Sequence, residues 1–289
     1  MKAKSDIRPS TIAGSWYPGD ARQLRVDIDR YVKSADLPEI IGEVIALIVP
    51  HAGYRYSGAV AGHAFAALQS IPPPDIVVVV SPMHGFHRAP LLTSAHKAYS
   101  TPLGEIPIDT TALHTLNEQL KGMLGYGLTA IRFDDEHALE IELPFLQQIL
   151  IAPFSLLPVM VRNQNVQVMR TLGIALAKTL EGCNSVVVAS TDLSHFYPQE
   201  KAKTLDAEIL QHIEALNPVA IIQAEEKKEG FACGRGAVAA VLWAAQNMGA
   251  NHAKIVKYAT SGDVSGDYSQ VVGYGAAVIT KTTENLVKD

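Results

Sequence analysis

The chain has 289 residues, of which 48% are hydrophobic and 18% charged, so it can bury a sizeable core. Its formal net charge of −5 gives no general attraction to polyanions, which argues against nucleic acid or an anionic membrane surface as a partner. Because no apolar run could span a bilayer, the two cysteines are too few for a disulfide framework and the N-terminus lacks an apolar leader, we expect a cytoplasmic protein.

Short runs rich in β-branched residues alternate with helical patterns along the chain. In chain order we expect strand 43–49, helix 59–68, strand 75–80, helices 111–120 and 166–180, strand 185–190, helices 204–216 and 237–249, and strands 253–259 and 270–280. This alternation predicts a single α/β domain over residues 1–289, a three-layer α/β/α sandwich with a mixed, mostly parallel sheet. The last two strands are close enough to pair antiparallel. The weakly periodic stretch 81–109 is expected to be functional or to carry small strands of its own.

Three of the expected strands run directly into loops that begin with ligand-type residues. "ALIVPHAGYRYSG" delivers His51, "VVVVSPMHGFH" delivers His84, and "VVVASTDLSHFYP" delivers Asp192 and His195. In open α/β sheets ligands bind beyond the carboxyl ends of the strands, so these loops can converge. One such histidine alone is more often structural than functional. The threefold recurrence of the pattern indicates a shared site.

Cys233 lies in "GFACGRG" (230–236), a turn of small residues just before a helix. One thiolate and two imidazoles form a common ligand set for a transition metal, and they leave positions open for water or substrate. We expect Arg235 and the amides of the following helix to lower the pKa of the thiol. Two alternatives stay open: a small buried residue near a turn, and a nucleophilic cysteine with His195 as base and Asp192 as its orienting partner.

The segment "FDDEHALEIELPFL" (133–146) carries a further pair of titratable residues. Asp134 or Asp135 can cap a short helix, which places His137 and Glu140 three apart on one face. Such a pair is either part of a capped surface helix or a device that orients a ligand or passes a proton.

Six segments together resemble the Memo family, known in bacteria and archaea as the protein B group of the AmmeMemoRadiSam system. They are "AGSWYPGD" (13–20), "PHAGYRYSG" (50–58), "SPMHGF" (81–86), "DDEHALEIELPFL" (134–146), "STDLSHF" (190–196) and "ACGRG" (232–236). The resemblance implies the fold of class III extradiol dioxygenases, non-haem iron enzymes that open catechol rings. It matches His51 and His84 to their histidine metal ligands and His195 to their catalytic base. Cys233 stands in place of their carboxylate ligand.

The resemblance therefore implies one transition-metal ion, with iron favoured and copper or zinc as alternatives. It also implies a pocket that takes a small molecule or a peptide, and a functional association with a radical SAM protein. We expect Trp16, Tyr17, Tyr54 and Arg235 to contact the substrate, the alternative for Trp16 and Tyr17 being a buried anchor for the N-terminal segment.

The leading functional hypothesis is a metal-dependent redox enzyme in which His195 is the acid–base group. In this hypothesis Asp192 holds the His195 imidazole in one tautomer. A second hypothesis is a binding module that recognises a peptide or a partner protein. A third is a zinc hydrolase in which His195 or Glu140 activates metal-bound water.

Overall fold

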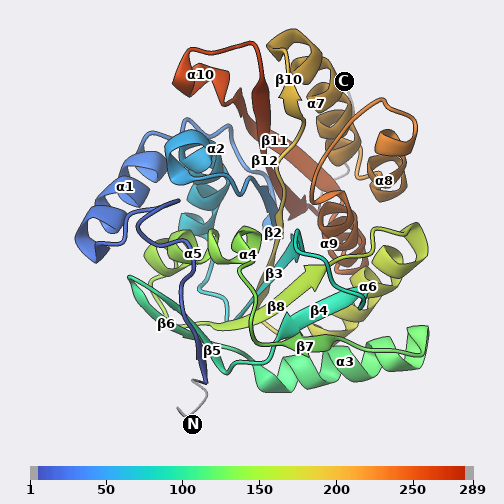
Figure 1. Cartoon of the computed structure of the whole chain (residues 1–289). Helices are drawn as coiled ribbons and strands as arrows, with labels where there is room; N and C mark the ends of the chain where they lie inside the picture. Colours follow the sequence, from blue (N-terminus) through green and yellow to red (C-terminus); the bar gives the residue numbers. More distant parts are fainter. Residues whose placement is uncertain (1–5, 284–289) are drawn as a thin grey trace.

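The computed structural model describes residues 6–283, which form a central sheet covered by helices on both faces (Figure 1). The nine-stranded sheet has the order β10-β12-β2-β9-β3-β8-β4-β7, and β11 also pairs with β12. The central strands are parallel: β2 (Glu43–Val49), β9 (Ser185–Ser190), β3 (Ile76–Pro82) and β8 (Ser155–Val161). The outer strands are β10 (His195–Tyr197), β11 (His252–Thr260), β12 (Val271–Lys281), β4 (Leu91–Ser94) and β7 (Thr129–Ile131). The pairs β11–β12, β12–β2 and β4–β8 are antiparallel, so the sheet is mixed, as expected.

The central strands are apolar on both sides because each side packs against its own layer. Along β3, Val78 and Val80 belong to one hydrophobic cluster, while Val77 and Val79 belong to the other. This alternation is the two-sided burial that a continuous run of valines predicts. The strand runs of the sequence therefore correspond to the middle layer of the fold.

The two outer layers are built from different parts of the chain. One layer holds α3 (Thr110–Leu124), α6 (Val166–Thr179), α7 (Gln199–Glu214), α8 (Pro218–Glu226) and α9 (Arg235–Asn247). The other holds α1 (Ala21–Lys33), α2 (Tyr54–Ala66), η1 (Ala67–Ser70), α4 (His137–Glu140) and α5 (Leu143–Ile149). The short α10 (Gly262–Ser265) joins β11 to β12. Across residues 6–283, no helix is both long enough and apolar enough to cross a membrane.

The stretch 81–109 carries small strands, as expected. Besides β4 it contains β5 (Ala98–Thr101) and β6 (Gly104–Pro107), which pair antiparallel. β1 (Ile7–Arg8) adds to β5 in parallel and completes a separate three-stranded sheet. The N-terminal segment is thereby attached to the layer that contains α4 and α5.

A buried ion-pair network fastens this N-terminal segment to α4. The Arg8 guanidinium is 2% exposed and donates to Glu140 Oε2 and Asp134 Oδ1, each at 2.7 Å. Glu140 is fully buried and also accepts hydrogen bonds from the Thr11 amide at 3.0 Å and the Tyr17 hydroxyl at 2.9 Å. Because the charged groups of Arg8, Glu140 and Asp134 are all buried, the network is stable only while these charges remain paired.

We predict that Glu140→Ala lowers the free energy of unfolding by about 3 kcal/mol or more, because it breaks the buried Arg8 ion pair and removes the acceptor of the hydrogen bonds from the Thr11 amide and the Tyr17 hydroxyl. Urea unfolding followed by circular dichroism measures the change. The matched control is Glu200→Ala, which removes a carboxylate that is 89% exposed and pairs with Lys203, and should change stability by less than about 1 kcal/mol. Equal effects of the two substitutions would contradict the stabilising role of the network.

Candidate metal centre

The loops that follow three adjacent parallel strands meet at one edge of the sheet. β2, β9 and β3 are neighbours in the sheet, and His51, Asp192 and His84 each lie two residues past the end of one of them. Cys233 comes from the loop that precedes α9. One ligand atom each from His51, His84 and Cys233 lies within 4.8 Å of the other two. The structure thus brings together the three residues expected to bind a metal.

His51 is buried with its two ring nitrogens in different environments. Nε2 lies 3.1 Å from Cys233 Sγ, and Nδ1 lies 3.0 Å from the hydroxyl of Ser190, the last residue of β9. Ser190 has one hydroxyl proton, for which the Ala138 carbonyl and Glu142 Oε1 are both acceptors at 2.7 Å, so Ser190 accepts a hydrogen bond from Nδ1–H. The Nε2 lone pair then faces Cys233. Burial, together with the nearby His84 and His137, lowers the pKa of His51 and keeps the ring neutral, as a metal ligand requires.

His84 is oriented by a carboxylate. Its Nδ1 lies 2.9 Å from Glu136 Oε1, and its backbone amide donates to Glu136 Oε2 at 2.5 Å. Although burial acts to raise the pKa of Glu136, hydrogen bonds from His84 and from the Ala138 amide hold it below its usual value. An ionised carboxylate only accepts, so Nδ1 carries the proton and Nε2 is left as the ligand atom. The hydrogen bond to Glu136 raises the pKa of His84, against the effect of burial.

The environment of Cys233 differs from the expected one. Burial, reinforced by the charge of Asp192, raises the pKa of the thiol rather than lowering it. Arg235 does not offset this, because its guanidinium forms an ion pair with Glu225. The Asp192 amide donates to Sγ at 3.2 Å, and Sγ lies 3.5 Å from the Asp192 carbonyl, which can accept the thiol proton. Without a cation in the site, Cys233 is therefore a neutral thiol.

Asp192 contacts His51 rather than serving as the expected partner of the His195 ring. Its Oδ1 accepts from the His51 amide at 2.8 Å, and Oδ2 lies 4.0 Å from His51 Nε2. Burial raises the pKa of Asp192 to about 7, although backbone amides and the nearby His84 oppose the increase. The carboxyl group can thus exchange a proton near neutral pH.

His195 begins β10 at the side of the cluster. Within the part of the chain that the structure describes, its Nε2 is buried and has no hydrogen-bond partner. Burial, and secondarily the charge of His84, lowers the pKa of His195. Its ring packs against the rings of Phe196 and Phe231. Phe196 has a φ of 61°, a left-handed conformation that is rare for an aromatic residue and common at functional sites.

A second group of ligand-type atoms, from His84, Glu136 and His137, also lies within 4.8 Å. The His84 and His137 rings, however, are stacked, with centroids 4.8 Å apart and planes only 13° from parallel. A nitrogen lone pair lies in the plane of its ring, so two stacked imidazoles cannot direct their lone pairs at one ion. The His51 ring stands at 86° to His84 and can converge with it. His137 therefore forms a wall of the site.

Of the residues expected to contact the substrate, only Trp16 presents an exposed side chain beside the cluster. Trp16 is 37% exposed, and its ring lies 4.3 Å from that of His137, which places it beside the cluster. Tyr17 and Tyr54 are buried anchors, with hydroxyl groups that donate to Glu140 and to the Ile141 carbonyl. Arg235 is paired with Glu225. Glu140 belongs to the Arg8 network, so its geometry supports a structural role rather than proton transfer with His137.

Sequence reasoning missed two residues that orient the ligands, Glu136 and Ser190. Helix capping could have identified Glu136, because it directly precedes α4. In the structure its side chain caps the helix and accepts a hydrogen bond from the Ala138 amide at 2.9 Å. The sequence placed this cap at Asp134 or Asp135, one or two residues too early. No signal marked Ser190, which the strand pattern treats as one more small residue.

Comparison with known proteins identifies the family of this chain. A family model described as "Memo-like protein" matches residues 8–278. The chain belongs to the Memo-like family. A MEMO1 family protein of Methanopyrus kandleri is 37% identical, covering 95% of this chain and 99% of the relative. One from Methanococcoides burtonii is also 37% identical, covering 94% and 100%, and one from Thermotoga neapolitana is 32% identical, covering 95% and 100%.

A solved structure shares the fold of this Memo-like chain. The crystal structure of an uncharacterized protein from Escherichia coli K12 aligns with a TM-score of 0.56, over 82% of this chain and 100% of that chain. The sequences are 13% identical, so the match concerns the fold alone.

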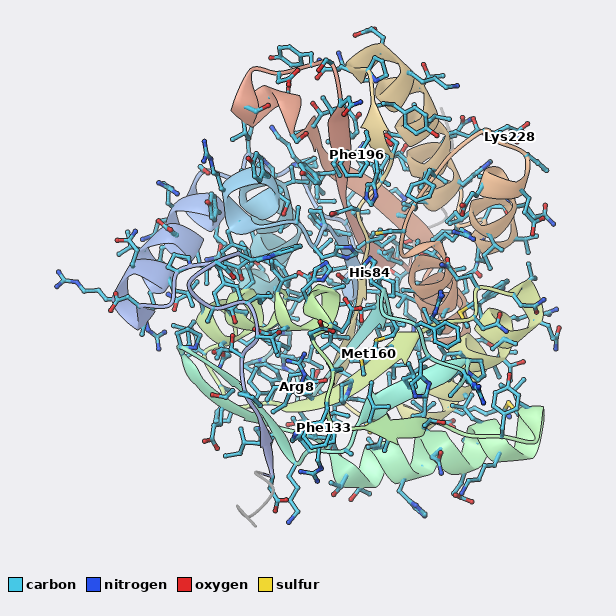
Figure 2. All side chains as sticks on the ribbon, in the orientation of Figure 1. Arg8, His84, Phe133, Met160, Phe196 and Lys228 are labelled. Atoms are coloured by element: carbon cyan, nitrogen blue, oxygen red, sulfur yellow. The ribbon has the colours of Figure 1, made fainter. Side chains whose placement is uncertain are left out.

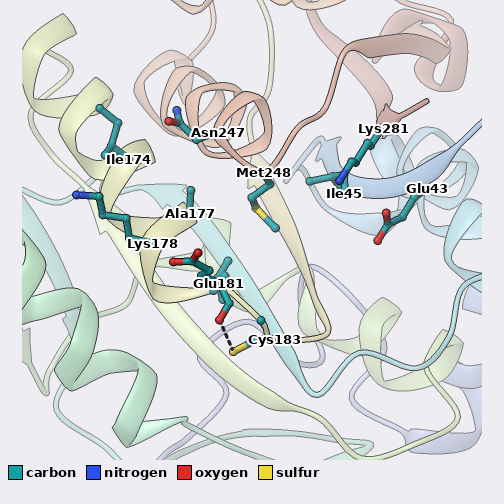
Figure 3. Close-up of a pocket in the computed structure, with 12 residues that line it drawn as sticks. Glu43, Ile45, Ile174, Ala177, Lys178, Glu181, Cys183, Asn247, Met248 and Lys281 are labelled. Carbon is teal, nitrogen blue, oxygen red and sulfur yellow. Dashed lines mark hydrogen bonds between the residues drawn. The ribbon is translucent and has the colours of Figure 1, made fainter. Parts of the chain in front are cut away.

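The two cysteines of this Memo-like chain have contrasting surroundings. Cys183 is exposed in a groove of about 430 Å³ bordered by α6, α9 and the end of β12, where Lys178 and Lys281 also lie (Figure 3). Cys233 is only partly exposed and has a raised pKa. Its thiol reacts as a thiolate only after losing a proton that the buried site retains.

In metal-free protein we predict that iodoacetamide modifies Cys183 on the order of 10-fold faster than Cys233. Peptide mass spectrometry after timed exposure measures both rates in one sample. In urea-unfolded protein the two cysteines should react at similar rates, which provides the internal control. Faster modification of Cys233 in the folded protein would show that its thiol is activated, as the sequence interpretation held.

Proposed function

We propose that this protein binds one transition-metal ion through His51, His84 and Cys233 and acts as a metal-dependent redox enzyme. The observation that carries the proposal is the orientation of both imidazoles. Ser190 accepts a hydrogen bond from Nδ1 of His51, and Glu136 accepts one from Nδ1 of His84, so the Nε2 lone pair of each ring is free. The Nε2 atom of His51 lies 3.1 Å from Cys233 Sγ. Oriented ligand pairs of this kind are typical of metal sites.

The donor set fits a transition metal better than Mg²⁺ or Ca²⁺, because it offers two imidazole nitrogens and one sulfur. A thiolate ligand suits iron, copper or zinc, and the resemblance to non-haem iron dioxygenases favours iron. Three protein ligands leave coordination positions open, and the side chain of His84 is 38% exposed, so the cluster is accessible from that side. Iron or copper would supply one-electron chemistry at this position, whereas zinc would act as a Lewis acid.

Three residues near the cluster, His195, Asp192 and Trp16, would exchange protons with a bound substrate or contact it. His195 Nε2 is buried and unpaired within residues 6–283, so it is free to hold or to move a proton at a substrate atom. Asp192, with its pKa raised to about 7, is a second group that can hold a proton at neutral pH. Trp16, whose ring packs at a tilt against His137, offers an aromatic surface beside the cluster for a planar part of a small molecule or peptide.

We predict that His51→Ala, His84→Ala and Cys233→Ala each lower the metal content of anaerobically purified protein by about 10-fold or more. Plasma mass spectrometry measures the content and identifies the metal. His114→Ala and Cys183→Ala remove an exposed histidine and the exposed cysteine, and should retain the wild-type content. Unchanged metal content in all three site variants would refute the proposal.

A separate test distinguishes whether His195 transfers protons or binds the metal. We expect His195→Ala to keep the wild-type metal content, because none of the three proposed ligands is altered. Oxygen uptake by the iron-loaded variant should fall on the order of 10²-fold if His195 supplies the proton-transfer group. Loss of metal comparable to that of His84→Ala would instead make His195 a fourth ligand and would imply a closed structural site.

A further inference from the structure

Two buried glutamates lie two residues apart in sequence and have opposite surroundings. Glu140 is fully buried, and its carboxylate accepts hydrogen bonds from the Arg8 guanidinium and the Thr11 amide. Glu142, which directly precedes α5, is 1% exposed, and no basic side chain within residues 6–283 forms an ion pair with it. A buried carboxylate without a cation is unfavourable as an ion. The state of Glu142 therefore depends on its hydrogen bonds.

The Ser190 hydroxyl group connects Glu142 to His51. Its oxygen lies 2.7 Å from Oε1 of Glu142, 2.7 Å from the Ala138 carbonyl and 3.0 Å from Nδ1 of His51. The His51 ring lies 5.3 Å from that of His84, which Figure 2 shows near the centre of the molecule. One hydroxyl group thus separates Glu142 from a proposed metal ligand.

The number of protons around the Ser190 oxygen determines the state of Glu142. Ser190 supplies one proton, and the Ala138 carbonyl and an ionised Glu142 could both only accept it. A separation of 2.7 Å between two oxygens is that of a full O–H···O hydrogen bond, so each of the two contacts needs a proton of its own. A carbonyl oxygen carries none. The second proton therefore belongs to Glu142.

The electrostatic surroundings favour the same state. Burial raises the pKa of Glu142 well above its ordinary value, against the effect of the Ser190 hydrogen bond, and the negative charge of Asp192 adds to the increase. From α2, Tyr54 also faces Glu142, and burial together with the Glu142 charge raises the pKa of this phenol, which is therefore neutral. The groups around Glu142 thus supply no positive charge that would favour its ionised form.

We propose that Glu142 is a protonated carboxylic acid at neutral pH and a positioning residue for the metal ligand His51. The Glu142 O–H group donates to Ser190, and the Ser190 proton is directed at the Ala138 carbonyl. The remaining lone pair of Ser190 is then fixed as the acceptor of His51 Nδ1–H. Residues that hold the second nitrogen of a ligating imidazole orient its ligand atom. The proton on Glu142 is a property of the metal-free protein, whereas its effect on metal affinity rests on the proposed function.

Infrared difference spectroscopy of the metal-free full chain tests the proton directly, because a protonated carboxyl group has a C=O stretching band separate from those of ionised carboxylates. We expect this band in the wild type at pH 7 and its loss in Glu142→Gln, whose neutral amide can still donate to Ser190. Glu200→Gln is the matched control: it alters a side chain that is 89% exposed and should remove only an ionised carboxylate band. Loss of an ionised carboxylate band in Glu142→Gln would overturn the proposal.

The pH dependence of stability provides a second measurement. Folded Glu142 keeps its proton, whereas the unfolded chain loses it above a pH of about 4.3, so this group destabilises the wild type as the pH rises. Relative to Glu142→Gln, the unfolding equilibrium constant of the wild type should rise about tenfold per pH unit between about pH 5 and pH 7. Urea unfolding of both proteins at several pH values measures the ratio. A ratio that stays constant or falls would show that Glu142 is ionised in the folded protein.

Competition between the protein and a chromophoric chelator for Zn²⁺, which has no redox chemistry of its own, tests the positioning role. Glu142→Leu removes the donor to Ser190 and should weaken Zn²⁺ binding by about 10-fold or more, whereas Glu142→Gln should retain the wild-type affinity. Equal affinity of Glu142→Leu and the wild type, or equal weakening by both variants, would refute the role. Absence of Zn²⁺ binding by the wild type would refute the proposed function and with it the positioning role, whereas the infrared band would still establish the proton on Glu142.

Discussion

The parallel ladder of β2, β9 and β3 is the constraint on which the site depends. Because parallel neighbours end at the same edge, the ladder brings the loops carrying His51, Asp192 and His84 together. Ser190, at the end of the middle strand, hydrogen-bonds to His51. Hydrogen bonds between backbones thus bring together side chains as distant in sequence as His51 and Asp192, which are 141 residues apart. The loop that precedes α9 then delivers Cys233, which is 182 residues from His51 in sequence.

The segment of residues 134–140, which includes α4, contacts both the candidate metal cluster and the N-terminal segment. Glu136 and His137 face the cluster, where one orients His84 and the other stacks on it. Asp134 lies two residues before Glu136, and Glu140 lies three residues after His137. Both carboxylates face away from the cluster and pair with Arg8. The N-terminal segment and the cluster therefore share one support.

Burial sets the charge state of the cluster. It lowers the pKa of His51 and raises that of Asp192, Cys233 and Glu142, so each of these groups is shifted toward its neutral form, whereas the hydrogen bond to Glu136 raises the pKa of His84. A metal ion bound as proposed would replace the thiol proton of Cys233. The guanidinium of Arg235 is paired with Glu225, so it does not stabilise the thiolate form of Cys233.

The sequence alone determined the α/β architecture, because runs of valine report two-sided burial, and it brought His51 and His84 of the proposed ligand group to one edge, because each parallel strand delivers its following residues there. It did not reveal β8, since Pro158 interrupts the pattern; in the structure Pro158 pairs with Val79, and the β4 ladder covers only Met160 and Val161. Only the tertiary structure decided that Glu136 orients His84, that Glu140 binds Arg8, and that Asp192 contacts His51. These roles depend on the direction of each side chain and on which charges are buried together, and neither is encoded in local periodicity.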